Sequence, residues 1–211
     1  MKIGILRFPG TNCDYDIVEM VKAKSMTPVW LWHQDQFDPQ SVDRVIVPGG
    51  FSYGDYLRCG ALAAKSEVMK SVFEFAKKGR PILGICNGFQ ILCETGLLPG
   101  VLLRNQNLKF IDKWVDLQEE NQNPYFNPKS SKKDIRLPIA HGEGRFYISR
   151  EELKKIQDQN QIWLRYKEDI NGSTERIAGI MNLEKNICAL MPHPERALWD
   201  WMGGQDGFNF L

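Results

Sequence analysis

The stretch Pro81-Ile82-Leu83-Gly84-Ile85-Cys86-Asn87-Gly88-Phe89-Gln90-Ile91-Leu92-Cys93-Glu94 decides the fold of this chain. Its first half is a short apolar run that opens with a proline, the pattern of a strand buried on both faces. Its second half places apolar side chains at spacings that a helix can bury. The stretch therefore predicts a strand, a sharp turn at Cys86 and a helix.

The glycines at the second position on each side of Cys86 indicate a nucleophile turn. In such a turn the central residue is strained, and a Cβ on either of these neighbours would collide with the strand or the helix. The thiol would lie at the carboxyl end of the strand and at the N-terminus of the helix, which favours the thiolate. The alternative is a buried structural cysteine that happens to lie between glycines.

Apolar runs of strand length alternate with amphipathic runs of helix length over the first half of the chain. We predict strands over residues 3–6, 28–32, 45–47 and 81–85, and helices over residues 13–24 and 60–78. Thr11 or Asn12 is expected to cap the first helix. This alternation predicts a parallel sheet covered by helices on both faces, with ligands at the carboxyl ends of its strands.

The second half of the chain is richer in strands. We predict strands over residues 101–109, 113–117, 135–140, 162–166, 177–181 and 187–191, and a helix over residues 151–159 capped by Ser149. The polar run over residues 118–133 is expected to be a surface loop and not a domain linker. Residues 1–211 are expected to form a single domain.

Composition excludes several classes of function. The chain carries 27 Lys and Arg against 26 Asp and Glu, a net charge of +1, so no nucleic-acid or membrane partner is expected. Five cysteines, an odd number with no C-x-x-C pair, argue against a disulfide framework or a zinc site. With no secretory signal and no apolar run of membrane-spanning length, we expect a soluble, cytoplasmic protein.

A thiolate nucleophile needs a base, a group that orients the base, and donors for the oxyanion. His193 and Glu195 lie in Met191-Pro192-His193-Pro194-Glu195-Arg196, just after a predicted buried strand. Pro194 favours an extended backbone at His193, and residues two apart then point to the same side. Cys86, His193 and Glu195 thus predict a catalytic triad; the alternative is a solvated His and Glu in a turn.

Two further segments are candidates for contact with a ligand. Pro48-Gly49-Gly50 follows a predicted strand, and the N–H groups of Gly50 and Asn87 could together form an oxyanion hole. His141-Gly142-Glu143-Gly144-Arg145 is interpreted as a loop that touches a ligand or partner, or simply as a turn. His33 is expected to be an ordinary histidine at a strand end.

Three motifs in combination resemble the class I glutamine amidotransferases, and most closely the branch of glutaminase subunits that serves purine synthesis. The motifs are Pro48-Gly-Gly-Phe-Ser-Tyr-Gly-Asp-Tyr-Leu-Arg58, Gly84-Ile-Cys-Asn-Gly-Phe-Gln90 and Met191-Pro-His-Pro-Glu-Arg196. Residues 4–12 and 137–145 are also similar to that branch. Residues 168–173 depart from it, since Glu168-Asp-Ile-Asn-Gly-Ser173 stands where the branch has Asn-Pro-Asn-Gly-Ser, and this departure concerns loop and partner contacts.

The resemblance implies a flavodoxin-like α/β domain, with a mostly parallel central sheet flanked by helices and a β-rich C-terminal part. It implies that Cys86 forms a γ-glutamyl thioester, that His193 is base and then acid, and that Glu195 orients it. Gly50 and Asn87 are implied as oxyanion donors, and Phe51 and Gln90 as glutamine-binding residues, with no metal and no cofactor in this subunit.

The resemblance also implies partners. Ammonia would pass to a large synthetase subunit that uses ATP and Mg to convert formylglycinamide ribonucleotide to the amidine, with a small third subunit bridging the two. The alternatives are a glutaminase serving another synthase, a non-catalytic regulatory subunit of the same fold, and a cysteine hydrolase of small carbonyl compounds.

Overall fold

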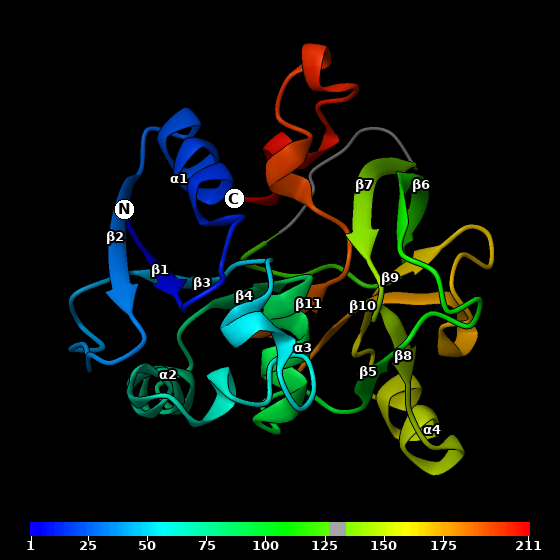
Figure 1. Ribbon diagram of the computed structural model, residues 1–211, viewed down its shortest axis with the longest axis horizontal. Helices are drawn as coiled ribbons and strands as arrows, with labels where there is room; N and C mark the ends of the chain where they lie inside the picture. Colours follow the sequence, from blue (N-terminus) through cyan, green and yellow to red (C-terminus); the bar gives the residue numbers. More distant parts are fainter. Residues whose placement is uncertain (127–133) are drawn as a thin grey trace.

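The computed structural model describes residues 1–126 and 134–211 of the chain. Among these residues, nine strands form one mixed sheet in the order β2-β1-β3-β4-β11-β10-β9-β6-β7 (Figure 1). The strands of this sheet are β1 (Lys2–Arg7), β2 (Thr27–Trp32), β3 (Arg44–Val47), β4 (Ile82–Ile85), β6 (Ile111–Glu119), β7 (Ile135–His141), β9 (Ile162–Tyr166), β10 (Ile177–Met181) and β11 (Ile187–Leu190). A small second sheet pairs β5 (Val101–Leu103) with β8 (Arg145–Tyr147).

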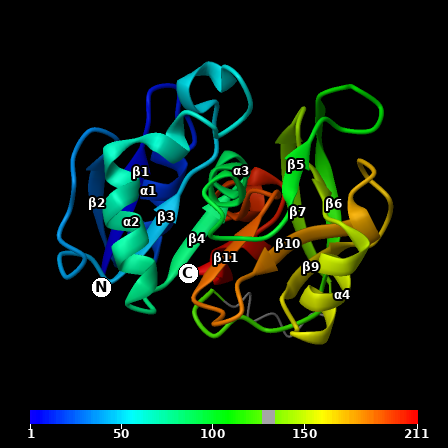
Figure 2. The same ribbon diagram turned by 90° about the horizontal axis from the view of Figure 1, so that it is seen from below.

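The half of the sheet that carries the nucleophile turn is parallel. Strands β2, β1, β3, β4 and β11 each run parallel to their neighbours. All four residues of β4 are buried, as the apolar run predicts for a strand covered on both faces. The helices are α1 (Asp14–Ala23) on one face and α2 (Glu67–Lys77) and α3 (Asn87–Glu94) on the other (Figures 1 and 2). The predicted α/β fold is confirmed.

The other half of the sheet is antiparallel. Strands β10, β9, β6 and β7 follow β11, each antiparallel to the one before. The fourth helix, α4 (Arg150–Asp158), precedes β9, and the Ser149 hydroxyl accepts a hydrogen bond from the Glu152 N–H as its predicted cap. The predicted β-rich C-terminal part is thus confirmed. Because β7 runs in the same direction as β11, its carboxyl end lies at the same edge of the sheet as the ends of the parallel strands.

Several predicted boundaries are wrong because tertiary contacts decide them. The helix predicted over residues 60–78 begins at Glu67, since Gly60 has φ +81° and packs closely against the main chain of Ile91. Cys13, not Thr11 or Asn12, directly precedes α1, and the Thr11 hydroxyl instead accepts a hydrogen bond from the Phe8 N–H. The strand predicted over residues 101–109 ends at Leu103.

The predicted loop over residues 118–133 is only partly correct. Gln118 and Glu119 are the last residues of β6. Phe126 is fully buried, with the guanidinium of Arg44 over its ring, and the Asn123 side chain bonds the main chain of Phe126. Residues 127–133, the rest of this prediction, lie outside the described residues. In the described part of the chain, no helix is both long and apolar enough to cross a membrane.

Candidate active site

Cys86 occupies the sharp turn that the sequence predicts. It follows β4 directly and precedes α3, with φ +52° and ψ −105°, a strained conformation for a residue with a Cβ. Its N–H donates to the Leu190 carbonyl (2.8 Å), which fixes the turn against β11. A Cβ on Gly88 would overlap the carbonyl oxygen of Val47 on β3, so a glycine is required there. The sheet and helix together therefore hold the thiol in place.

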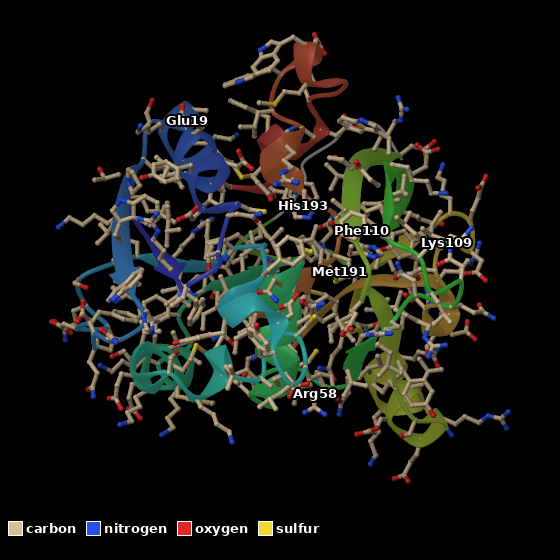
Figure 3. The ribbon with its side chains drawn as sticks, viewed as in Figure 1. Glu19, Arg58, Lys109, Phe110, Met191 and His193 are labelled. Atoms are coloured by element: carbon tan, nitrogen blue, oxygen red, sulfur yellow. The ribbon has the colours of Figure 1, made fainter. Side chains whose placement is uncertain are left out.

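His193 and Glu195 form a buried pair at the end of β11. His193 Nδ1 lies 2.6 Å from Glu195 Oε1, and the His193 N–H donates to the Pro138 carbonyl (2.8 Å). The reason differs from the one predicted, because Glu195 lies in a short helical turn (Pro194–Arg196) while His193 alone is extended. Nδ1 is the donor to this carboxylate, which leaves Nε2 free to exchange a proton with another group. Met191 and His193 lie at the middle of the molecule in Figure 3.

Electrostatics favour the protonated form of His193. Burial by itself lowers the pKa of this imidazole, but the charges of Glu195 and Cys86 more than offset it, so the pKa of His193 stands above its usual value. A buried imidazole with this pairing can take a proton from a thiol and later deliver it to a leaving group.

Gly50 and Asn87 carry the two main-chain N–H groups that the sequence predicts as oxyanion donors. Gly50 has φ +134°, and a Cβ on it would come within 2.6 Å of the Asn12 nitrogen, so glycine is required. The Ser52 N–H donates to Asn87 Oδ1 (3.2 Å), which ties the glycine loop to the start of α3. Within the described residues, no protein acceptor takes the main-chain N–H of Gly50 or of Asn87. Both donors are thus available to a ligand.

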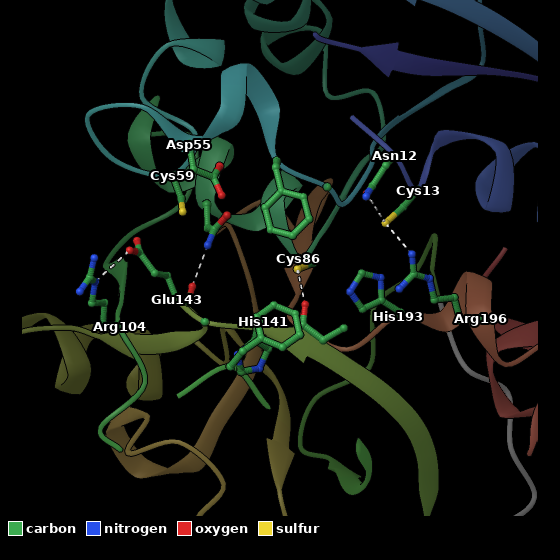
Figure 4. Close-up of a pocket in the computed structure, with 16 residues that line it drawn as sticks. Asn12, Cys13, Asp55, Cys59, Cys86, Arg104, His141, Glu143, His193 and Arg196 are labelled. Atoms are coloured by element: carbon green, nitrogen blue, oxygen red, sulfur yellow. Dashed lines mark hydrogen bonds and ion pairs between the residues drawn. The ribbon is translucent and has the colours of Figure 1, made fainter. Parts of the chain in front are cut away.

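These residues surround one cavity of about 390 Å³ at the carboxyl edge of the sheet (Figure 4). Its volume suits a small molecule. Of the residues predicted from the sequence, the cavity is lined by Gly50, Phe51, Cys86, Gln90 and His193. Glu195 lies behind His193, and Asn87 lies at the base of the turn.

Phe51 and Gln90 differ in how free they are to meet a ligand. Phe51 is exposed at the cavity mouth. The Gln90 side chain is buried and already bonded: it donates to the Glu143 carbonyl (2.7 Å) and accepts from Asn87 Nδ2 (2.8 Å). Gln90 therefore joins the turn at Cys86 to the segment after β7 and shapes the cavity wall.

Each of the two remaining histidines is bonded through Nδ1 to a neighbouring side chain. His141 is the last residue of β7 and not part of a loop, and it lines the cavity with Nδ1 bonded to Asn105 Oδ1 (3.1 Å). Burial, with the charge of His193 in second place, lowers its pKa to about 4, so it is neutral near pH 7. His33 follows β2 as expected, and its Nδ1 lies 2.5 Å from the Tyr53 hydroxyl, which anchors the loop after Gly50.

Seven further residues with polar, charged or aromatic side chains line the cavity and were not predicted to do so: Asn12, Cys13, Asp55, Cys59, Arg104, Phe110 and Arg196. Asn12 and Cys13 had an available signal. They follow β1, and the carboxyl ends of parallel strands meet at one edge of a sheet. The others come from loops whose paths depend on the tertiary structure. His141, Gly142 and Glu143 line the cavity as well, so the segment 141–145 lies at the cavity, as its interpretation as a ligand-contacting segment requires.

One side of the cavity is acidic. Burial raises the pKa of the Asp55 carboxyl, and the neighbouring charge of Glu143 raises it further. Burial and the Asp55 charge also raise the pKa of the Cys59 thiol, which keeps that thiol protonated. Arg104 pairs with Glu143 (3.4 Å) at the rim. This wall suits a ligand that carries a positive group, which the carboxylates can bind, next to a negative group, which Arg104 can bind.

Cys13, His193 and Glu195 have ligand atoms within 4.8 Å of one another, a grouping that could hold a metal ion. Their existing contacts favour acid–base chemistry instead. Arg196 Nη2 donates to Cys13 Sγ (3.1 Å), so a guanidinium already covers the sulfur, and His193 and Glu195 bond each other. All five cysteines are free thiols.

Comparison with known proteins places the chain among glutamine amidotransferases. Residues 1–205 match the CobB/CobQ-like glutamine amidotransferase domain. The chain is 47% identical over 213 aligned positions to the phosphoribosylformylglycinamidine synthase subunit PurQ of Zymomonas mobilis, covering 100% of this chain and 96% of that protein.

Solved structures agree with this assignment. A chain in the structure of PurLQS from Thermotoga maritima superposes with a TM-score of 0.90 at 43% identity, covering 99% of this chain and 94% of that one. A glutamine amidotransferase from Thermotoga maritima has a TM-score of 0.64 at 18% identity, covering 93% and 77% of the two chains, and shares the fold. A putative GMP synthase protein from Thermoplasma acidophilum shares it likewise, with a TM-score of 0.64 at 15% identity over 100% and 92%.

Proposed function

The chain belongs to the CobB/CobQ-like glutamine amidotransferase family, and we propose that it is the glutaminase subunit of a phosphoribosylformylglycinamidine synthase. The observation that carries the chemistry is the geometry of one cavity. Cys86 stands there on a strained turn, beside His193 with its buried Glu195 partner and the free N–H groups of Gly50 and Asn87.

The reaction follows from this arrangement. The Cys86 thiolate attacks the side-chain amide carbon of glutamine, and the N–H groups of Gly50 and Asn87 stabilise the oxyanion that develops. His193, protonated at Nε2, delivers its proton to the leaving nitrogen, which departs as ammonia and leaves a γ-glutamyl thioester. Water then attacks the thioester, His193 takes its proton and returns it to the sulfur, and glutamate is released. These steps use side chains and main-chain groups of this chain alone.

The charges of the cavity fit the other end of glutamine. Asp55 and Glu143 offer carboxylates to its α-ammonium group, and Arg104 at the rim offers a guanidinium to its α-carboxylate. Phe51, exposed at the mouth, covers the aliphatic part. This end of the ligand does not react, so these contacts set affinity and specificity and not the chemistry.

Ammonia must then reach an acceptor. We propose two partners, a large synthetase subunit that uses ATP and Mg²⁺ and a small bridging subunit, in line with the PurLQS assembly of the Thermotoga relative. The cavity mouth carries an apolar rim of two loops that fits such a partner. Phe51, Arg104 and Phe110 line the cavity itself. Further exposed side chains continue along the same two loops: Tyr56, Leu57 and Arg58 on one, and Leu108 and Lys109 on the other.

Substitution of Leu57 tests directly whether this rim binds the synthetase subunit. It is 88% exposed and has φ +71°, a strained conformation that turns an apolar side chain towards solvent. Leu57→Asp is expected to weaken, about tenfold or more, the binding to the synthetase subunit, because an interface would bury the new charge. The control is Leu183→Asp, since Leu183 is also exposed (56%) but lies in the β10–β11 turn at the opposite edge of the sheet. Binding measured by calorimetry should fall for Leu57→Asp alone; equal loss in both variants would remove the rim from the interface.

Reconstitution tests the function as a whole. The chain, mixed with the synthetase and bridging subunits, ATP, Mg²⁺ and formylglycinamide ribonucleotide, is expected to make the amidine from glutamine and to release one glutamate per amidine. Without this chain, the synthetase should use ammonium salts only. Glutamine-dependent synthesis that is the same with and without the chain would refute the proposal, and would leave a regulatory role.

A further inference from the structure

A second thiol lies beside the catalytic pair, and the reaction above does not use it. Cys13 directly precedes α1, is buried, and lines the cavity. Its sulfur lies within 4.8 Å of a ring nitrogen of His193 and of a carboxylate oxygen of Glu195. A Cβ added to Gly49 would come within 2.9 Å of the His193 ring, 3.1 Å of Cys13 Sγ and 3.4 Å of Cys86 Cβ. The two thiols and the imidazole therefore pack around one glycine with no spare room.

Cys13 also bonds a cationic side chain, the guanidinium of Arg196. Its sulfur accepts a hydrogen bond from Arg196 Nη2 (3.1 Å; Figure 4). Arg196 Nε pairs with Asp16 Oδ2 (3.1 Å). Cys13 and Asp16 both belong to the start of α1, so this helix binds the guanidinium at two points. The Cys13 thiol in turn donates to Asn12 Oδ1 (3.4 Å). Burial is the main reason why the pKa of the Cys13 thiol is raised, so the sulfur that Arg196 meets is a neutral one.

The position of this cation matters because Arg196 follows Glu195 in the chain. Glu195 uses one carboxylate oxygen, Oε1, to bond His193. Its other oxygen, Oε2, is buried and has no hydrogen-bond partner in the described part of the chain. An unpaired carboxylate oxygen in a buried site attracts any nearby cation strongly. A guanidinium released from α1 would therefore be drawn to Oε2 and would compete with His193 for the charge of Glu195.

We propose that Cys13 is a positioning residue, which holds the Arg196 guanidinium on α1 and so reserves the Glu195 carboxylate for His193. The inference rests on the proposed glutaminase function. It assigns Cys13 a role that differs from that of Cys86: the sulfur of Cys13 forms no bond to substrate, and its effect on Glu195 runs through Arg196.

The titratable and charged groups that face the His193 ring come from every element around it. They are Cys13 just before α1, Cys86 just after β4, His141 at the end of β7, and Glu195 from its own segment. Arg196 interacts with Cys13, Asp16 and Glu195. Glu195 is the group that raises the pKa of His193 most. If Arg196 turns to Glu195, the Glu195 charge stabilises protonated His193 less, and His193 loses its proton at a lower pH. Because protonated His193 is the acid for the leaving ammonia, the basic limb of the rate profile should then move to lower pH.

The test uses glutamine hydrolysis by the assembled complex, measured from pH 6 to 10 as kcat and KM. Cys13→Ala is expected to lower kcat about 10- to 100-fold, to leave KM nearly unchanged, and to move the basic limb to lower pH. Cys13→Ser keeps an acceptor for Arg196 and should recover most of kcat and the position of the limb. Adding Arg196→Gln to Cys13→Ala removes the competing cation and should return the limb to the wild-type position or above it.

The controls separate the possible failures. Cys93→Ala removes another buried thiol, on α3 outside the cavity, and should not move the limb. Thermal unfolding of each variant measures the loss of packing. If Cys13→Ala does not fold, Cys13→Val, which fills the space without offering Arg196 an acceptor, replaces it in every comparison. A fall in kcat with an unmoved limb in Cys13→Ser and Cys13→Ala, or wild-type kinetics in both, would overturn the inference. An inactive wild-type complex, or Cys86→Ser as active as wild type, would instead refute the proposed function.

Discussion

Cys86→Ser is expected to abolish synthesis from glutamine, by at least about 10³-fold, while the assembled complex keeps its synthesis from ammonium salts. The hydroxyl occupies the same strained turn, but it is a far weaker nucleophile near pH 7 because it does not ionise there. The synthetase subunit should be unaffected, because the turn at β4 and α3 is packed inside this chain. Amidine formation with each nitrogen source measures both halves of the prediction.

The identity of the nucleophile is tested separately, because two thiols lie beside His193. A glutamine-like diazoketone is expected to add one adduct to the chain in the complex, mapped by mass spectrometry to Cys86 and blocked by glutamine. Cys13 should not react, since burial raises the pKa of its thiol and Arg196 covers its sulfur. Cys93→Ser serves as the matched control for losing a buried thiol. An adduct on Cys13, or loss of ammonium-dependent synthesis in Cys86→Ser, would contradict this assignment.

Gly50→Ala is expected to lower kcat for glutamine hydrolysis about 10²–10³-fold, the usual effect of losing one oxyanion donor. A Cβ at this position would come within 2.6 Å of the Asn12 nitrogen, and φ is +134°. The loop must therefore shift, and its N–H leaves the position that the oxyanion occupies. KM for glutamine should change much less, because the contacts to the unreactive end of the ligand stay in place.

Gly79→Ala is the matched control for Gly50→Ala. Gly79 also has a positive φ, +70°, but a Cβ there meets no atom within 4 Å, and the residue follows α2 at the edge of the sheet opposite the cavity. Alanine at a positive φ costs about 1–3 kcal/mol of stability in either variant. Kinetics of the two variants, with their unfolding free energies, separate strain from catalysis. Equal kcat values in both would remove Gly50 from the oxyanion site.

The sequence alone predicted the parts of the site that directly follow strands and whose backbone conformation or packing requires particular residues such as glycine. The glycines around Cys86 predicted the turn, because close packing of β4, α3 and β3 leaves no room for a Cβ. Alternating strands and helices predicted the sheet, and the sheet edge in turn predicted that Cys86 and Gly50 would lie together. The pairing of His193 with Glu195 was predicted for a partly wrong reason, since Glu195 lies in a helical turn.

What the tertiary structure decided is which residues far apart in sequence share a surface. Arg196 bonds Cys13 although the two residues lie near opposite ends of the sequence, and Glu143 lines the same cavity as Asp55 and Gln90. No local sequence pattern predicts either contact. Helix starts such as Glu67 and strand ends such as Leu103 were also set by packing and not by local propensity. Periodicity and glycine spacing report on the backbone within a single element, whereas contacts between loops depend on the full path of the chain. The fold and the strained turn at Cys86 could therefore be predicted from the sequence, while the second thiol, its guanidinium and the acidic wall required the folded molecule.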